Sequence, residues 1–131
     1  MDKESQRELD TLIKEYDSFV KESLASELGL RNKYLWSENG SIYVRKLLHP
    51  SLPHCFCISS IELSEHMRGK GIMTAFLDYV ENNLSEYAGV EFECIHNHDL
   101  VNYLKKRGYT WSPYRAGYLK DLEHHLYKAK A

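Results

Sequence analysis

The feature that most restricts the fold is a predicted strand, a glycine-containing turn, a helix and a second strand in direct succession. The segment Cys55–Leu63 (CFCISSIEL) is typical of a strand, and Val90–Ile95 (VEFECI) alternates apolar and acidic residues as a second strand would. Between them, apolar residues recur at helical spacing from Gly71 to Leu84. Such a unit contains a locally parallel strand pair, so the sequence predicts an α/β or α+β fold with a mixed sheet.

The first thirty residues predict an amphipathic helix. Over 3–28, apolar residues spaced by three and four form one stripe, with charged residues on the opposite side. Gly29 is placed to end this helix. This apolar stripe must be buried, either against a sheet of the same chain or against a second chain.

A hairpin is predicted over 33–48, and two further elements follow the strand–helix–strand unit. Asn39 and Gly40 lie between aromatic and β-branched runs, and this pair is typical of a two-residue turn with positive φ angles. The segment 100–107 predicts a short helix, and 123–130 predicts a last strand.

Length and composition favour one domain over 1–131. No run approaches the ~20 apolar residues of a membrane helix. The charged segment MDKESQRELD lacks the apolar core of a secretory signal. Three cysteines in such a chain favour reduced thiols over a disulfide framework. We therefore expect a cytoplasmic protein with no membrane segment.

Charge and ligand spacing argue against two further classes. Seventeen Lys and Arg residues against nineteen Asp and Glu residues give a net charge of −2, which does not favour nucleic acid as a partner. Zinc ligands occur on two predicted strands, but without the C-x-x-C spacing of most structural zinc sites, and we predict no metal. These ligands are Cys55, Cys57, Cys94, His96 and His98.

The turn before the second predicted helix is suited to bind an anion. It holds Arg68, Gly69, Lys70 and Gly71. Glycines allow a ligand to approach the backbone, and the free N–H groups at a helix start favour phosphate groups. Neither G-x-G-x-x-G nor the P-loop pattern G-x-x-x-x-G-K-[ST] fits the spacing of this turn.

The same turn resembles the acyl-CoA-binding motif of the GCN5-related N-acetyltransferases, Q/R-x-x-G-x-G/A. Arg68 and Gly71 match its first and fourth positions, and Met73 stands where the family has Gly or Ala at the sixth. Downstream, the family often shows N-x-x-A-x-x-x-Y-x-x-x-G-F. Asn97 and the pair Gly108-Tyr109 match it, whereas Leu104 stands at the position of the Tyr.

The resemblance implies a mixed, mostly antiparallel central sheet flanked by helices, with an acyl-CoA-binding core over 55–110. Its fourth and fifth strands would be parallel and splayed, with the pantetheine arm of acetyl-CoA, the cosubstrate, lying between them. The pyrophosphate would bind the amides of the turn. The residues that the resemblance assigns to the cofactor are Ile61, Leu63, Arg68, Gly69, Lys70, Gly71, Ile72, Met73 and Asn97.

The resemblance further implies transfer of an acetyl group to an amine by direct attack on the thioester. The acceptor would be a protein side chain, an N-terminus or a small molecule. Glu62 is the first candidate for the general base, ahead of Glu93, His96 and His98. Tyr103, next to the family's Tyr position, is the candidate for the acid that protonates the CoA thiolate.

Two alternatives stay open at this point. One is a non-catalytic binding module on the same fold, since Met73 and Leu104 depart from the family patterns. The other is a nucleic-acid-associated modifying protein, suggested by the basic, aromatic C-terminal third. The family often dimerises, and the apolar stripe of the first helix is compatible with a homodimer.

Overall fold

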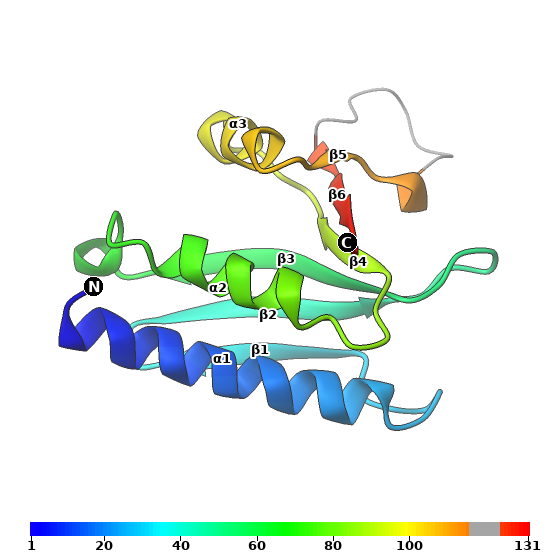
Figure 1. Ribbon diagram of the computed structural model, residues 1–131, viewed down its shortest axis with the longest axis horizontal. Helices are drawn as coiled ribbons and strands as arrows, with labels where there is room; N and C mark the ends of the chain where they lie inside the picture. The colour runs from blue at the N-terminus through cyan, green and yellow to red at the C-terminus, as the bar shows by residue number, and fades with distance from the viewer. Residues whose placement is uncertain (116–123) are drawn as a thin grey trace.

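The computed structural model describes residues 1–115 and 124–131 (Figure 1). The elements in chain order are α1 (Lys3–Leu24), β1 (Asn32–Ser37), β2 (Gly40–Leu47), β3 (Cys55–Leu63), η1 (Glu65–Met67), α2 (Ile72–Asn82), β4 (Gly89–Phe92), α3 (His98–Lys106), β5 (Thr110–Trp111), η2 (Pro113–Arg115) and β6 (Leu126–Ala129). In this described part of the chain, no helix combines the length and apolar character that crossing a bilayer requires.

The strands form one mixed sheet in the order β1-β2-β3-β4-β6-β5. The pair β3 and β4 is parallel, and the other pairs are antiparallel. The predicted mixed sheet with a strand–helix–strand crossover is therefore confirmed. Parallel pairing is short, from Phe56 opposite Val90 to Ile58 opposite Phe92, although β3 continues to Leu63.

Helices α1 and α2 lie side by side along β1–β3 and bury their apolar faces against the same side of the sheet (Figure 1). The ring of Tyr16 in α1 meets Phe56 of β3 edge-on at 5.0 Å and Phe76 of α2 at 6.1 Å. Burial of such large side chains contributes roughly 1.5–3 kcal/mol each. The apolar stripe of α1 is thus covered by this chain's own sheet, which removes the stripe as an argument for a homodimer.

Helix α1 ends four residues before the predicted Leu28. The buried ammonium of Lys46 donates to the Ser23 carbonyl oxygen at 2.7 Å, so a cation satisfies the C-terminal end of the helix. Gly29 is needed where the chain turns back, because a Cβ there would lie 2.7 Å from the Glu22 carbonyl oxygen.

The prediction of a turn with positive φ angles at Asn39 and Gly40 is wrong in two respects. The turn lies one residue earlier in the chain, and its φ angles are not positive. Ser37 pairs with Gly40, so the two turn residues are Glu38 and Asn39, and neither they nor Gly40 have a positive φ. Asn39 is fixed from outside the hairpin, since its backbone N and its Nδ2 both donate to Glu8 Oε1 at 2.9 Å. Gly40 is required for close packing, because a Cβ there would lie 2.5 Å from the carbonyl oxygen of Glu62.

Gly40→Ala is therefore expected to lower the free energy of unfolding by about 1–3 kcal/mol, as other overpacking substitutions do. The contact is with backbone, which cannot move aside as a side chain can. Urea unfolding followed by circular dichroism measures the change. An unchanged midpoint would contradict the close approach of the turn to β3.

The second half of the sheet differs from the predicted boundaries. Strand β4 ends at Phe92 rather than at residue 95, because the chain leaves the sheet and Cys94 adopts a positive φ of 54°. Strand β6 confirms the predicted last strand over a shorter range, and residue 123 lies outside the described residues. The two-residue strand β5 was not predicted.

Candidate functional site

The turn between η1 and α2 is an open group of backbone amides. Gly69 and Gly71 have φ angles of +71° and +84°, and a Cβ at either position would have no neighbour within 4 Å. Gly71 is the N-cap of α2, and no side chain caps this helix start. Among the described residues, none accepts a hydrogen bond from the backbone N–H groups of 69–74. Together with the positive end of the helix dipole, these groups suit an anion.

The cations of this turn are held by exposed, exchangeable contacts. Arg68 Nε donates to the Leu63 carbonyl oxygen at 3.0 Å, and Lys70 Nζ lies 3.1 Å from a carboxylate oxygen of Asp2. A hydrogen bond from the Ser5 backbone and another from Lys70 lower the pKa of Asp2 to about 2. Because exposed ion pairs contribute only about 0–1 kcal/mol, Lys70 can turn towards a bound anion at little cost. Arg68 would give up one exposed hydrogen bond to do the same.

A cleft of about 290 Å³ opens where β3 and β4 part. Among the described residues, the last backbone hydrogen bond between the strands runs from the Glu93 N to the Ile58 carbonyl oxygen and is 3.1 Å long. Beyond it the cleft is lined by Ile58, Ser59, Ser60, Ile61, Phe92, Glu93, Cys94, Ile95, His96, Asn97 and Leu100. Figure 1 shows β4, β6 and α3 turning away from β3 on this side. We call this opening the β3–β4 cleft.

A β-bulge in β3 coincides with the point of divergence. Val44 pairs with Ile58 and the preceding Tyr43 pairs with Ser60, so Ser59 has no partner in β2. The hydroxyl of Ser59 donates instead to the carboxylate of Glu93 after β4. The bulge lets β3 bend away from β4, and this bending produces the cleft.

A buried ion-pair network lies on the face of the sheet opposite α1 and α2, and its member Glu93 also lines the cleft. Glu91 is fully buried and lies 2.8 Å from the Arg115 guanidinium, which also contacts Glu93 at 2.6 Å. Ser112 donates a further hydrogen bond to Glu91. The sulfur of Cys57 and the carboxylates of Glu91 and Glu93 lie close enough to share a cation, and the guanidinium of Arg115 already pairs with both carboxylates.

Glu93 is poorly suited to act as a general base. Arg45 Nη1 contacts both carboxylate oxygens at 2.8 and 2.9 Å, while Ser59 and Arg115 each engage one. Burial alone would raise the pKa of Glu93, but the hydrogen bonds from Ser59 and Arg45 and the charges of both arginines lower it below its ordinary value. A carboxylate held in its charged form by so many donors has little tendency to accept a proton.

Glu62 and Ile61 lie on opposite faces of β3. Ile61 packs against the main core beneath α1 and α2, whereas Glu62 is exposed and pairs with Ser41 of β2. Glu62 lines a separate hollow of about 590 Å³ beside the end of β3, together with Leu63 and Arg68. The structure thus places the candidate base in the same hollow as Arg68, one residue beyond the cleft lining.

The remaining predicted residues are divided between the cleft and the helix contacts. Asn97 lines the cleft and caps α3, its Oδ1 accepting from the backbone N of Asp99 and of Leu100. Tyr103 does not line the cleft, and its hydroxyl lies 2.7 Å from Thr74 Oγ1 in the first turn of α2. Met73 is half-buried against the core.

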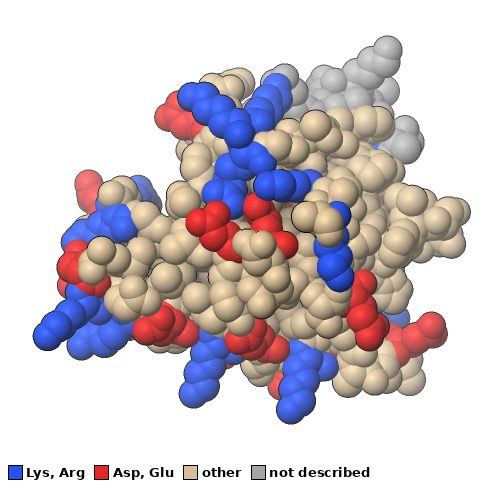
Figure 2. All heavy atoms as spheres, viewed as in Figure 1, with Lys and Arg blue, Asp and Glu red and all other residues tan. Residues whose placement is uncertain are grey.

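Charged groups gather over α3 and α2 without marking a second site. Figure 2 shows Lys and Arg side chains over α3 next to Asp and Glu side chains. Arg107 contacts Asp78 at 2.8 Å and Glu81 at 3.0 Å, and Lys128 contacts Glu81 at 3.0 Å. Arg107 therefore ties α3 to α2.

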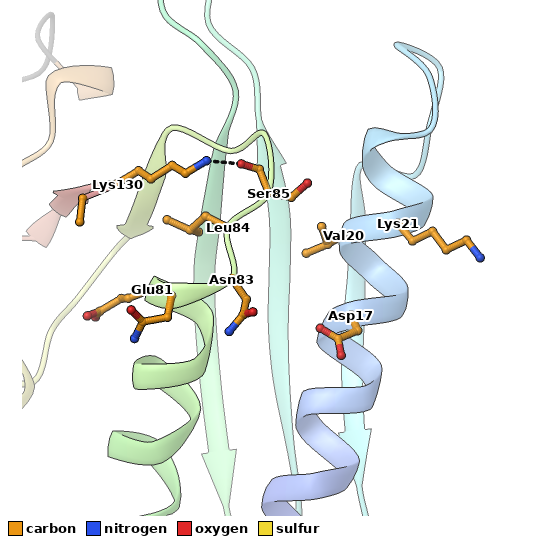
Figure 3. A pocket seen from close by; sticks show the side chains of 10 residues that line it. Asp17, Val20, Lys21, Glu81, Asn83, Leu84, Ser85 and Lys130 are labelled. Carbon is orange, nitrogen blue, oxygen red and sulfur yellow. Dashed lines mark hydrogen bonds between the residues drawn. The ribbon is translucent and has the colours of Figure 1, made fainter.

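A polar hollow of about 670 Å³ lies at the C-terminal end of α2, remote from the amide turn (Figure 3). Asp17 and Val20 of α1 line one side of this hollow. On the opposite side, the ammonium of Lys130 donates to the Ser85 carbonyl oxygen. Nothing in it resembles the anion site at the other end of the helix.

Sequence reasoning missed the ion-pair network. Arg45 lies in the predicted hairpin, and Glu91 and Glu93 alternate in VEFECI, so acidic residues inside a strand were the available signal. Buried carboxylates need partners. The partner Arg115 comes from η2, a turn that no periodicity predicts.

Three features define a class of fold: the sheet order, the parallel pair of β3 and β4 that diverges at a bulge, and the glycine turn that leads into α2. The chain has the fold of the GCN5-related N-acetyltransferases. A chain of the crystal structure of the KacTA–DNA complex matches with a TM-score of 0.56 and 13% identity, over 89% of this chain and 80% of that chain.

Two AtaT structures match at lower coverage. AtaTR bound with AcCoA gives a TM-score of 0.52 at 12% identity, over 70% of this chain and 58% of that chain. AtaT complexed with acetyl-methionyl-tRNAfMet gives a TM-score of 0.51 at 12% identity, over 70% of this chain and 62% of that chain. The present chain thus spans about three fifths of the AtaT chains. No family model and no curated protein sequence matches it. These likenesses establish the fold.

Proposed function

We propose that this chain is an acyl-CoA-dependent N-acyltransferase that moves the acetyl group of acetyl-CoA to an amine. The observation that carries the proposal is the position of the amide turn and the β3–β4 cleft on successive parts of one segment. Strand β3 lines the cleft over 58–61 and leads through η1 into the turn at 69–71. Similar folds have been solved with AcCoA and with an acetylated aminoacyl-tRNA.

The amide turn is the proposed site of the CoA pyrophosphate. The N–H groups of 69–73 would donate to its oxygens, and the dipole of α2 would favour its charge. Arg68 and Lys70 would exchange Leu63 and Asp2 for phosphate oxygens. Both present contacts are exposed, so the two side chains can give them up for a phosphate.

The β3–β4 cleft is the proposed site of the pantetheine arm. Beyond Ile58 the edge of β3 that faces β4 has lost its strand partner, so we expect the backbone near Ile61 and Leu63 to pair with the amides of the arm. Asn97 uses Oδ1 to cap α3, which leaves its Nδ2 as a donor beside the arm.

In the proposed reaction the amine nitrogen attacks the thioester carbonyl carbon, a C–N bond forms, and the C–S bond breaks to release the CoA thiolate. The nitrogen then loses its second proton as the amide forms, and the thiolate gains one to become CoA thiol. Glu62 would take the proton that the ammonium must lose, directly or through water. Tyr103 would return a proton to the thiolate only by exchanging its bond to Thr74.

Glu62→Gln is expected to lower the acetylation rate about 10²–10⁴-fold, the usual contribution of a general base. The affinity for acetyl-CoA should not change, because Glu62 is not assigned to the cofactor. Release of CoA thiol, measured over a panel of amines, gives the rate, and calorimetry gives the affinity.

Glu65→Gln is the matched control, since Glu65 is an exposed carboxylate of η1 that does not line the hollow. Equal rates in Glu62→Gln and the wild-type protein would contradict the role of Glu62.

A non-catalytic acyl-CoA-binding module is the second candidate. It is favoured by Leu104, which is fully buried where the family often has a Tyr, and by Tyr103, which lies outside the cleft lining. Acetyl-CoA binding without CoA release from any amine of the panel would select this candidate.

A further inference from the structure

Three aromatic rings lie on the sheet face opposite the helices, two of them exposed and the third half-buried. Leu35 and Ile42 of the hairpin point into the core under α1, so the alternating residues Tyr34, Trp36 and Tyr43 take the other face. The rings of Tyr34 and Trp36 stack at 5.4 Å, and those of Tyr34 and Tyr43 are 4.6 Å apart. Tyr34 is 48% and Trp36 60% exposed. We call these three residues the aromatic strip.

The aromatic strip adjoins the hollow that Glu62 lines. This hollow lies between the hairpin turn and the end of β3, and its walls include Trp36, Glu38, Glu62 and Arg68. Among the described residues, none forms a hydrogen bond or ion pair with the exposed carboxylates of Glu38 and Glu62. The guanidinium of Arg68 donates to the Leu63 carbonyl oxygen, and with acetyl-CoA bound it would turn to the pyrophosphate instead. We call this the acidic hollow.

The acidic hollow, the aromatic strip and the β3–β4 cleft follow one another along the hairpin. Ser41 pairs with Glu62 in the hollow, and two residues further Tyr43 pairs with Ser60, which lines the cleft. Paired residues of antiparallel strands have Cβ atoms about 4.5–5.5 Å apart. A group held in the hollow is therefore close to the cleft mouth.

Resting on the proposed function, we infer that the acidic hollow and the aromatic strip bind the acceptor, and that the acceptor is a lysine side chain on a polypeptide. Two carboxylates and the face of Trp36 match a protonated primary amine through charge and cation–π attraction. The same carboxylates repel the phosphates of a nucleic acid. The rings of Tyr34 and Tyr43, which lie next to Trp36, extend the contact beyond the ammonium, as a peptide requires and a free amine does not.

Binding in the acidic hollow would also bring the acceptor amine to Glu62, the proposed general base. The ammonium paired with Glu62 gives its proton to that carboxylate, and the neutral amine is then the nucleophile for the thioester. Glu38 remains charged and holds the rest of the acceptor in place.

Fluorescence of Trp36 provides the test in a Trp111→Phe background, where it is the one tryptophan of the chain. The probe is a blocked Ala-Lys-Ala tripeptide, compared with its norleucine analogue and with free n-butylamine. We expect a saturable change in Trp36 fluorescence with the lysine peptide. The affinities of the norleucine peptide and of n-butylamine should each be at least about tenfold lower. Glu38→Gln with Glu62→Gln should weaken the lysine peptide about tenfold, and Glu65→Gln should leave it unchanged.

Three results would overturn the inference: equal binding of the norleucine peptide, n-butylamine binding as tightly as the peptide, or tighter binding of a single-stranded RNA oligomer. The titrations contain no acetyl-CoA, and calorimetry on the same variant measures acetyl-CoA binding separately. If the lysine peptide does not bind while acetyl-CoA does, the lysine site alone is refuted. Failure of acetyl-CoA with peptide binding intact refutes the proposed function and leaves a lysine-binding surface.

Discussion

Replacing Gly71 with aspartate is expected to abolish acetyl-CoA binding while the fold survives. The carboxylate would stand at the N-cap of α2, among the amides proposed to hold the pyrophosphate, and would repel its charge. At a separation of about 4 Å and an effective dielectric constant near 20, two like unit charges repel by about 4 kcal/mol, or roughly a thousandfold in affinity. A Cβ at this position would have no neighbour within 4 Å, so the side chain can leave the backbone without a clash.

Gly71→Asn is the matched control. Asparagine has the same shape without the charge, and like aspartate it tolerates the positive φ of 84° better than most residues. We expect the Asn variant to lose much less affinity than the Asp variant. Calorimetric titration with acetyl-CoA measures both, and circular dichroism checks the fold. Equal affinity in the folded Asp variant and the wild-type protein would contradict the pyrophosphate site.

Arg115→Met is expected to destabilise the protein by about 3–5 kcal/mol, the usual cost of removing one partner of a buried ion pair. Methionine keeps much of the side-chain volume but leaves Glu91, which is fully buried, without its cation. Urea unfolding of the wild-type protein and the variant measures the difference in free energy.

Arg45→Met is the control within the same network. The side chain of Arg45 is 40% exposed and Glu93 keeps its contact to Arg115, so the loss should be about 1 kcal/mol. The lowered pKa of Glu93 adds a second measurement. A depressed pKa gives stability that is present above the unfolded value of about 4.3 and is lost as the pH falls through the folded value. Arg115→Met should weaken this acid dependence, and an unchanged pH profile would contradict the network.

The parts of the fold that the sequence predicted are those governed by local periodicity. The alternation of VEFECI and the helical spacing after Gly71 predicted the parallel pair and its crossover helix, and the structure has both. The amide turn was found because glycines and basic residues follow a strand directly.

The parts that the sequence could not give depend on contacts between distant segments. Glu8 of α1 fixes the hairpin turn, so Gly40 serves close packing rather than a positive φ. The bulge at Ser59 decides which face of β3 Glu62 occupies, and no local pattern in CISSIEL predicts a bulge. The charge network joins Glu91 to Arg115 across 24 residues.

Calorimetric titration of the full chain with acetyl-CoA, with CoA as the comparison, tests the central claim most directly. The amide turn and the β3–β4 cleft hold the part that both molecules share, so both should bind with a Kd on the order of micromolar, about −8 kcal/mol. Absence of measurable binding for both molecules would contradict the assignment of the turn and the cleft to acyl-CoA.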